Sequence, residues 1–287
     1  IEKAYEPIFR IATNYIVFRL IIWGGALLIL LWAFHRLNLQ MDIVLFVFLV
    51  LYLLRFSYGR VSLGVAIMFL GYSFLINPFK PGKLVSFVIG LLLLFFSLSF
   101  HKTMLLAIIA IPLAFLKWNR STLLFAMAFF PLLVFFVNTS LVEYILANNL
   151  IEDEQQLYAI NSYMSNYGKE SGWGIKLANL LQALPFYLCI LVYFRDKKYY
   201  HLNTSEKTVQ RTFSLLIAMV FIASAFVFRQ ALVYRRLLYM TYPAFVAAIA
   251  EIWKIEGKTK WINTVLTISI VYQAYELLYA IYCMSAR

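Results

Sequence analysis

The sequence predicts an all-α integral membrane protein, a single bundle of about ten transmembrane helices. Hydrophobic residues make up 63% of the 287 residues, whereas charged residues make up only 13%, about half their share in a soluble domain. The apolar stretches approach the roughly twenty residues that cross a bilayer core. They recur as far as the C-terminus, which a single removable signal peptide does not explain. Lipid is therefore expected to be part of the solvent.

The individual helices are expected where apolar runs lie between charged residues, prolines and glycines. The predicted spans are residues 14–34, 42–54, 61–76, 84–99, 103–116, 121–138, 174–194, 212–228, 237–253 and 261–282. Residues 139–173 interrupt this pattern with five carboxylates and form the one large loop, outside the membrane. All of residues 1–287 form one transmembrane domain. Because the chain opens at Ile1 rather than Met, we also expect further residues upstream.

The orientation of the bundle follows from its loops. Residues 195–211 and 254–260 are dense in lysine and arginine, which is typical of cytoplasmic loops. Counting helices alternately from these two segments puts the acidic loop 139–173 outside. On the predicted outer side, arginine outnumbers lysine eight to four, although the positive-inside rule disfavours basic residues there. We therefore expect some of these arginines to have a function.

Composition and spacing also exclude several classes of protein. The net charge of +12 comes from basic residues that stand singly or in small groups between apolar runs, so no nucleic acid is expected as a partner. Cys189 and Cys283 fall inside apolar spans and are expected to be buried small residues. No His, Cys or carboxylate pair has the spacing of a metal site, and no phosphate-binding glycine loop occurs. We expect neither a metal nor a cofactor.

Five arginines lie at or just within the outer ends of predicted helices: Arg55, Arg60, Arg229, Arg235 and Arg236. An arginine near hydrocarbon costs several kcal/mol unless it is paired, hydrated or snorkelling. Few carboxylates on the outer side can pair with them, namely Glu6, Glu143 and Glu276. Because guanidinium groups bind phosphate bidentately, a phosphate or diphosphate is the expected ligand. The alternative is that each arginine snorkels to lipid headgroups or makes a structural ion pair.

His101 is the second candidate, at the outer turn beside Lys102. A histidine there can act as a general base near neutral pH, and the alternative is a hydrogen-bonded packing residue. Gly64 and Gly71, seven residues apart in one predicted helix, are expected to permit close helix packing. Tyrosines in the last helix, such as Tyr272, favour interfacial anchoring, with stacking against sugar rings as the alternative.

Four segments resemble, in order, motifs of the EpsG-like, Wzy-type polysaccharide polymerases. YEPIFR (5–10) is similar to their Glu-Pro motif, and FSYGRVSLGVAIMFLGY (56–72) to their arginine-containing helix start. SLSFHKTMLLAIIAIPL (97–113) resembles their Phe-His-Lys segment, with Thr103 where serine is frequent. YRRLLYMTYPAF (234–245) resembles their Arg-x-x-x-Tyr helix. The outer loop 139–173 also falls where the family has its large outer loop.

The resemblance implies a multi-pass enzyme of the bacterial cytoplasmic membrane, of the kind that makes O-antigen or exopolysaccharide. It would join undecaprenyl-diphosphate-linked oligosaccharide repeat units at the outer face. By position, the resemblance implies that Arg60, His101 and Arg235 are the catalytic residues, with Tyr239 and Glu6 in support as substrate-binding residues. The outer-side charges add four expected substrate-binding residues: Arg55, Arg229, Arg236 and Lys102. The expected partners are the lipid-linked oligosaccharide, membrane lipid and a chain-length regulator.

Three other functions use similar residues. A transporter or flippase of lipid-linked oligosaccharide would bind the same anion without breaking a bond, but its charges are expected near the bilayer midplane. An O-antigen ligase would use the same donor and attach the polymer to lipid A core. A membrane acyltransferase would also need a histidine and an arginine, although no acid flanks His101. The gathering of charges at one face favours the polymerase.

Overall fold

In the described part of the chain every element is a helix, which confirms the all-α prediction. The structure is a computed structural model that describes residues 6–12, 14–51, 61–78, 82–101, 104–115, 121, 181–191, 205–224, 231–253 and 259–285. The helices are α1 (Glu6–Ile11), α2 (Tyr15–Arg36), α3 (Met41–Leu51), α5 (Ser62–Ile76), α6 (Lys83–Ser97), α7 (Met104–Ala114), α11 (Ser205–Ser224), α12 (Ala231–Trp253) and α13 (Thr259–Ser285). Leu181–Leu191 is also helical.

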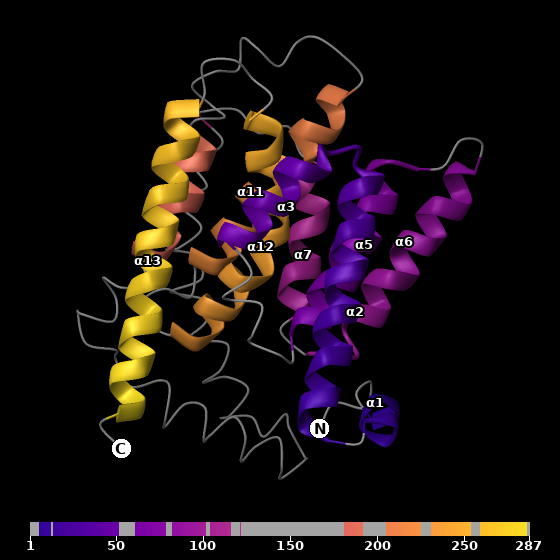
Figure 1. Cartoon of the computed structure of the whole chain (residues 1–287). Coiled ribbons are helices and arrows are strands. Elements are labelled where there is room, and N and C mark those ends of the chain that lie inside the picture. The colour runs from indigo at the N-terminus through magenta and orange to yellow at the C-terminus, as the bar shows by residue number, and fades with distance from the viewer. Residues whose placement is uncertain are drawn as a thin grey trace, which may run out of the picture.

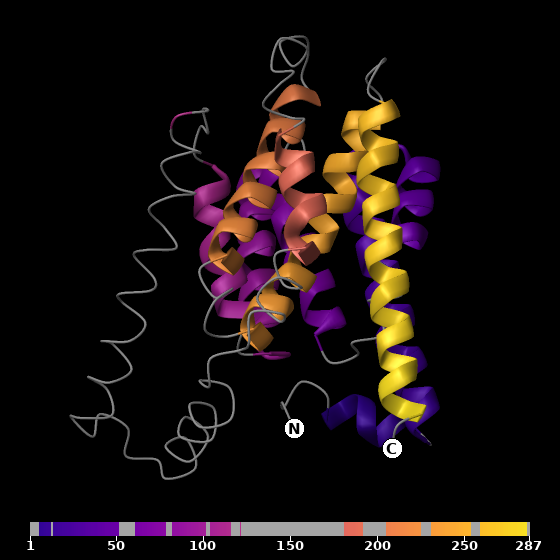
Figure 2. The same cartoon turned by 90° about the vertical axis from the view of Figure 1, so that its left-hand side faces the viewer.

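The helices run side by side in alternating directions (Figure 1). We call the end at which α2, α5 and α12 begin the outer end, which is the lower end in Figure 1. The short helix α1 lies across this end of the bundle (Figure 2). The helices α6, α11 and α13 end there. The up-and-down order therefore agrees with the alternation that the sequence predicted.

Several helix boundaries match the predicted spans, whereas others were wrong. The helices α2, α5 and α6 begin within one residue of prediction, and Asn14 caps α2 by accepting a hydrogen bond from the Val17 amide at 2.9 Å. However, α11 begins at Ser205 rather than 212, and α12 at Ala231 rather than 237. The helix α11 extends past its apolar run into polar residues such as Gln210, and α12 includes Arg235 and Arg236; glutamine and arginine both have good helix propensity. The sequence did not predict α1, and the span 121–138 and the loop 139–173 lie outside the described residues except for Ser121.

By length and composition, one helix in the described ranges, Tyr15–Arg36, is long and apolar enough to cross a membrane. The apolar helices α3 and α5 have 11 and 15 residues. At about 1.5 Å per residue, α5 spans roughly 23 Å, less than a bilayer core of about 30 Å. The other long helices of the described ranges, α11, α12 and α13, have 20, 23 and 27 residues and carry more polar side chains than α2 does.

Glycines set the contact between α5 and α6, which are among the most extensively packed helices. A Cβ placed on Gly71 would lie 2.9 Å from the Gly90 carbonyl oxygen, and one on Gly90 would lie 2.8 Å from Leu75 Cδ2. Both distances are shorter than a normal van der Waals contact. The two backbones touch because neither residue has a side chain, so the predicted role of Gly71 in close packing is confirmed.

The helix α6 exposes large apolar side chains, and three of its four buried residues are small. Its buried face consists of Ser86, Gly90, Leu94 and Ser97. Its exposed face includes Leu84, Val85, Phe87, Val88, Leu92, Phe95 and Phe96. A surface helix of a water-soluble protein has the opposite arrangement, with its apolar stripe facing the core.

At the inner end, arginines tie helices together. Arg36 donates a hydrogen bond to the Asn77 carbonyl at 2.7 Å, and the Asn77 side chain donates one back to the Arg36 carbonyl at 2.6 Å. The Arg36 guanidinium also lies 3.7 Å from the centre of the Phe74 ring. The Tyr72 hydroxyl donates to the Arg211 carbonyl at 2.7 Å. These contacts hold α5 to α2 and α11, at the end away from the predicted site.

Candidate functional site

The start of α5 is joined to α12 by a buried hydrogen bond. Ser62, the first residue of α5, is 0% exposed, and its Oγ lies 2.9 Å from the Tyr239 hydroxyl. Most other buried hydroxyls bond to a carbonyl of their own helix, as the Thr241 hydroxyl does to Leu237 at 2.8 Å, which is the usual local solution. The Ser62–Tyr239 bond instead joins α5 to α12, between residues that are 177 positions apart in the sequence.

This bond brings together two of the predicted motifs. Arg235 precedes Tyr239 by four residues, so both lie on one face of α12. Arg235 is exposed at the outer end, whereas Tyr239 reaches into the core and is 5% exposed. Arg60 lies outside the described residues, but it is only two residues before Ser62. The Ser62–Tyr239 bond therefore joins the α5 start next to Arg60 with the helical turn that follows Arg235.

The turn that carries His101 packs against the same part of α5. A Cβ on Gly64 would lie 3.0 Å from Phe100 Cβ, 3.4 Å from the Ser97 carbonyl oxygen and 3.5 Å from Met104 Sδ. The predicted close packing at Gly64 is thus confirmed, and its partner is the His101 turn. His101 itself is half-buried. The first turns of α5 consequently contact both other motifs at the outer end of the bundle.

Tyrosines lie beside Arg235 at the start of α12. Tyr234 is buried and is within electrostatic reach of Arg235, Tyr187 and Tyr272. The Tyr187 hydroxyl is hydrogen-bonded to the Ser224 hydroxyl at the end of α11. The Leu181–Leu191 helix, α12 and α13 therefore bring three phenols near a guanidinium, and α11 adds the Ser224 hydroxyl. Such groups can hydrogen-bond a polar ligand and pack against its apolar faces.

The remaining predicted residues are placed less centrally or are not described. Glu6 forms an ion pair with Arg10 at 2.7 Å on α1, and the two side chains are 62% and 77% exposed, so the pair contributes little to stability. Arg236 is half-buried beside Arg235. Four predicted residues lie outside the described part of the chain: Arg55, Arg60, Lys102 and Arg229.

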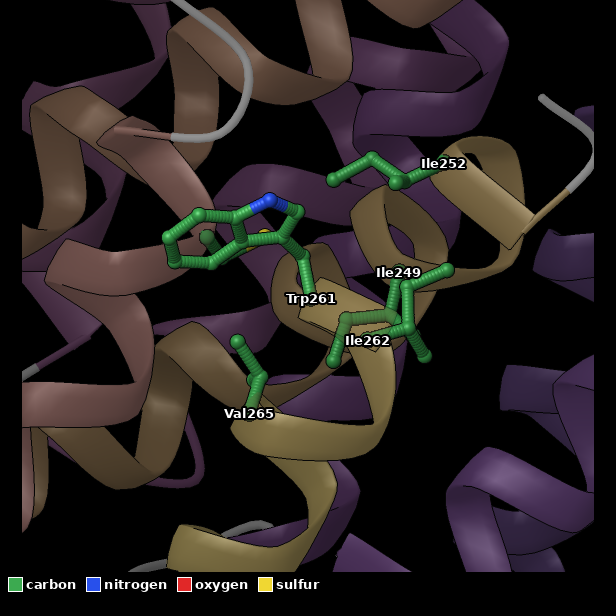
Figure 3. A pocket seen from close by; sticks show the side chains of 6 residues that line it. Ile249, Ile252, Trp261, Ile262 and Val265 are labelled. Carbon is green, nitrogen blue, oxygen red and sulfur yellow. The ribbon is translucent and has the colours of Figure 1, made fainter. Parts of the chain in front are cut away.

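The pocket in Figure 3 lies elsewhere, where the inner part of α12 meets the start of α13. It is lined by Cys189, Ile249, Ile252, Trp261, Ile262 and Val265. No charged side chain is among these lining residues, so the pocket does not suit a phosphate or diphosphate. The outer end near Arg235 is the better candidate for the functional site.

The EpsG family model matches residues 6–286, which is nearly the whole chain. The chain belongs to the EpsG family. The match spans the positions of Glu6, Arg60, His101 and Arg235, so the resemblance seen in the four motifs is confirmed at the level of the family. No curated protein and no solved structure matches the chain. EpsG family membership supports a role in membrane polysaccharide biosynthesis and is consistent with a glycosyltransferase-type polymerase.

The sequence did not identify Ser62 as part of the junction in this EpsG family protein. We expect Ser62→Ala and Tyr239→Phe each to lower the free energy of unfolding by about 0.5–1.5 kcal/mol, because each removes the buried hydrogen bond between α5 and α12. The double variant should lose no more than one single variant does. Thermal unfolding of the protein in detergent measures both effects.

Ser97→Ala is the matched control for this cycle. The Ser97 hydroxyl donates to its own helix at the Leu94 carbonyl, 2.6 Å away. Its removal should therefore add independently to Tyr239→Phe. Additive losses from Ser62→Ala and Tyr239→Phe would show that the two hydroxyls are not coupled.

Proposed function

We propose that this EpsG family protein is a polysaccharide polymerase, a glycosyltransferase that joins undecaprenyl-diphosphate-linked repeat units. The observation that carries the proposal is the junction at the start of α5. There the Ser62–Tyr239 bond and the Gly64 contact draw together segments that adjoin Arg60, Arg235 and His101. A cationic group at two of these positions and a titratable base at the third suit transfer from a diphosphate leaving group.

The surface of the bundle supports its placement in the bacterial cytoplasmic membrane. The exposed face of α6 is built of leucine, valine and phenylalanine, whereas its buried face has serine and glycine. Small residues at helix contacts and large apolar residues facing outward are typical of helices in lipid. In water the same face would be an unusually large exposed apolar patch. In the multi-pass arrangement proposed here, Arg235 lies at the outer leaflet.

The proposed reaction exchanges one bond for another at the anomeric carbon of the donor sugar. The acceptor hydroxyl oxygen forms a bond to this carbon, the bond to the diphosphate oxygen breaks, and the acceptor proton goes to His101. The electron pair of the broken bond leaves with undecaprenyl diphosphate. Since negative charge grows on the diphosphate in the transition state, fixed guanidinium groups at Arg60 and Arg235 stabilise that state more than the ground state.

The distribution of charge favours this enzyme over a transporter. Transporters of anionic substrates bind near the bilayer midplane, with interrupted helices in both halves of the chain. In the described residues, Arg235 and Arg236 lie near the start of α12, at the outer end, and His101 lies in the turn that joins the end of α6 to the start of α7. An O-antigen ligase would carry out the same bond exchange with a different acceptor, so the product decides between the two.

The experiment places the purified protein in lipid nanodiscs with lipid-linked repeat units isolated from cells that make it. We expect a ladder of products that differ by one repeat unit, with one undecaprenyl diphosphate released for each bond formed. A flippase would move the substrate across a vesicle membrane without releasing undecaprenyl diphosphate. A ligase would give product only after lipid A core is added. Unchanged repeat units in the presence of folded protein would refute the proposal.

A further inference from the structure

Gln182 is a buried amide without a hydrogen-bond partner in the described structure. It lies in the Leu181–Leu191 helix and is 2% exposed. Neither its Oε1 nor its Nε2 has a partner. Buried polar groups in native proteins are nearly always hydrogen-bonded, and each unsatisfied group costs about 1–3 kcal/mol. A buried side chain with both an unmet donor and an unmet acceptor therefore indicates a role other than packing.

The neighbours of Gln182 along its helix show which way it faces. Phe186 and Cys189 follow it by four and seven residues, so the three share one helical face. The Phe186 ring centre lies 5.2 Å from that of Tyr242 and 4.5 Å from that of Phe245. Cys189 lies further along, beside Ile249 and Ile252 of α12 in the pocket of Figure 3. The Leu181–Leu191 helix thus runs parallel to α12 with this face turned toward it.

The same register places Gln182 close to the candidate site. Because Phe186 packs against Tyr242 and Phe245 and the two helices run parallel, a residue one turn before Phe186 lies level with residues one turn before Tyr242 and Phe245. Those are residues 238–241 of α12. This turn contains Tyr239, the partner of Ser62. Residue 238 follows Arg235 by three positions, or about 5 Å along the helix axis. Gln182 therefore lies level with residues of α12 that are about one turn deeper in the bundle than Arg235.

The chemistry of the amide selects its ligand. Nε2 donates hydrogen bonds and Oε1 accepts them, so one ligand group satisfies both only if it can donate and accept. A sugar hydroxyl does both. Diphosphate oxygens only accept, and would leave Oε1 unmet, while a metal ion would bind Oε1 and leave Nε2 unmet. Of the parts of a lipid-linked oligosaccharide, the hydroxyl-bearing sugars therefore suit Gln182 better than the anionic diphosphate does.

The tyrosines around the contact between the Leu181–Leu191 helix and α12 suit the same ligand. Tyr187, on the same helix as Gln182, is hydrogen-bonded to Ser224, and Tyr234 lies within electrostatic reach of Tyr187, Tyr272 and Arg235. Aromatic faces with hydroxyl tips provide both the apolar and the hydrogen-bonding contacts that a sugar ring needs. These groups connect the helix that bears Gln182 with Arg235.

We propose that Gln182 is a positioning residue that hydrogen-bonds a hydroxyl of the acceptor repeat unit; this inference rests on the proposed polymerase function. Arg235 then holds the diphosphate end of the donor near the membrane boundary, while Gln182 holds a sugar one turn deeper. The amide does not touch the bond that breaks. It fixes the orientation of the sugar whose hydroxyl attacks.

The test uses Gln182→Met, which keeps the length of the side chain and removes the unsatisfied Nε2 donor and Oε1 acceptor. We expect the thermal stability of the protein to be equal to or above that of wild type, because the desolvated amide is gone. With lipid-linked polymer as a saturating donor and single repeat units as the varied acceptor, KM for the acceptor should rise at least about tenfold. Binding of undecaprenyl diphosphate should stay within about twofold of wild type.

Ile190→Met is the matched control, because Ile190 is a buried residue of the same helix that is 3% exposed; its acceptor KM should equal that of wild type. A wild-type KM in Gln182→Met would overturn the proposal, and so would a fall in thermal stability, since the amide would then have a structural partner. Wild-type polymerisation is measured alongside. Its absence would overturn the polymerase function itself, which separates the two failures.

Discussion

Replacing Arg235 with alanine is expected to lower the rate of glycan transfer by at least about 100-fold. Arg235 lies at the outer end of α12, one turn before the buried Tyr239 that holds α12 to α5. The proposed role of its guanidinium is to stabilise charge on the departing diphosphate. Arg235→Lys keeps the charge but loses the bidentate fork, so it should recover only part of the rate. The initial rate of undecaprenyl diphosphate release measures both variants.

Arg19→Ala is the matched control for Arg235→Ala. Arg19 also lies in the outer part of the bundle, but its guanidinium stacks on its own helix, 4.6 Å from the Tyr15 ring centre and 5.3 Å from that of Trp23. Its loss should change the transfer rate by less than about threefold, because its cation–π contacts stay within its own helix and are worth roughly 0.5–1 kcal/mol. Equal losses in the two variants would mean that general outer charge, rather than the position of Arg235, governs activity.

Gly71→Val is expected to destabilise the bundle by more than about 3 kcal/mol, because it forces a branched side chain into a closed backbone contact. Even the first added carbon would lie 2.9 Å from the Gly90 carbonyl and 3.2 Å from the Leu94 amide nitrogen. Both are backbone atoms that cannot turn aside as a flexible side chain can. The yield of monodisperse protein in size-exclusion chromatography and its thermal unfolding measure the effect.

Gly24→Val is the control for this substitution, because Gly24 of α2 has no atom within 4 Å of an added Cβ. It should give folded protein in wild-type yield. Should Gly71→Val also fold normally, α5 and α6 would be able to move apart without loss, and the glycine contact would not determine their packing.

The apolar pattern predicted the helices well where a helix and its apolar run coincide. The starts of α2 and α5 are close to prediction because Asn14 and the polar segment before Ser62 bound those runs. The predicted starts of α11 and α12 were wrong because hydropathy only reports which residues are apolar. The backbone hydrogen bonds of a helix continue into polar residues, such as Gln210 in α11. For α12 this matters, because the earlier start at Ala231 puts Arg235 inside the helix.

The candidate site was predicted only as a set of motifs. Local sequence identified Arg235 and His101, but it does not encode which hydroxyl Tyr239 meets, since Ser62 is 177 residues away. Gln182 did carry a signal, an amide within the predicted apolar span 174–194, and polar residues in such spans are functional candidates. Only the structure shows that this amide is buried and that neither of its polar atoms has a hydrogen-bond partner. The catalytic and binding roles of the named residues stay predictions.

The inverted surface of α6 has a thermodynamic consequence. If its large apolar side chains face lipid both before and after α6 associates with α5, little hydrocarbon passes between water and protein in that step. The heat capacity change of separating α5 from α6 in a bilayer should then be small, since that quantity arises from hydrating apolar surface. Close contact at Gly71 and Gly90, through dispersion forces rather than water release, would hold the pair together.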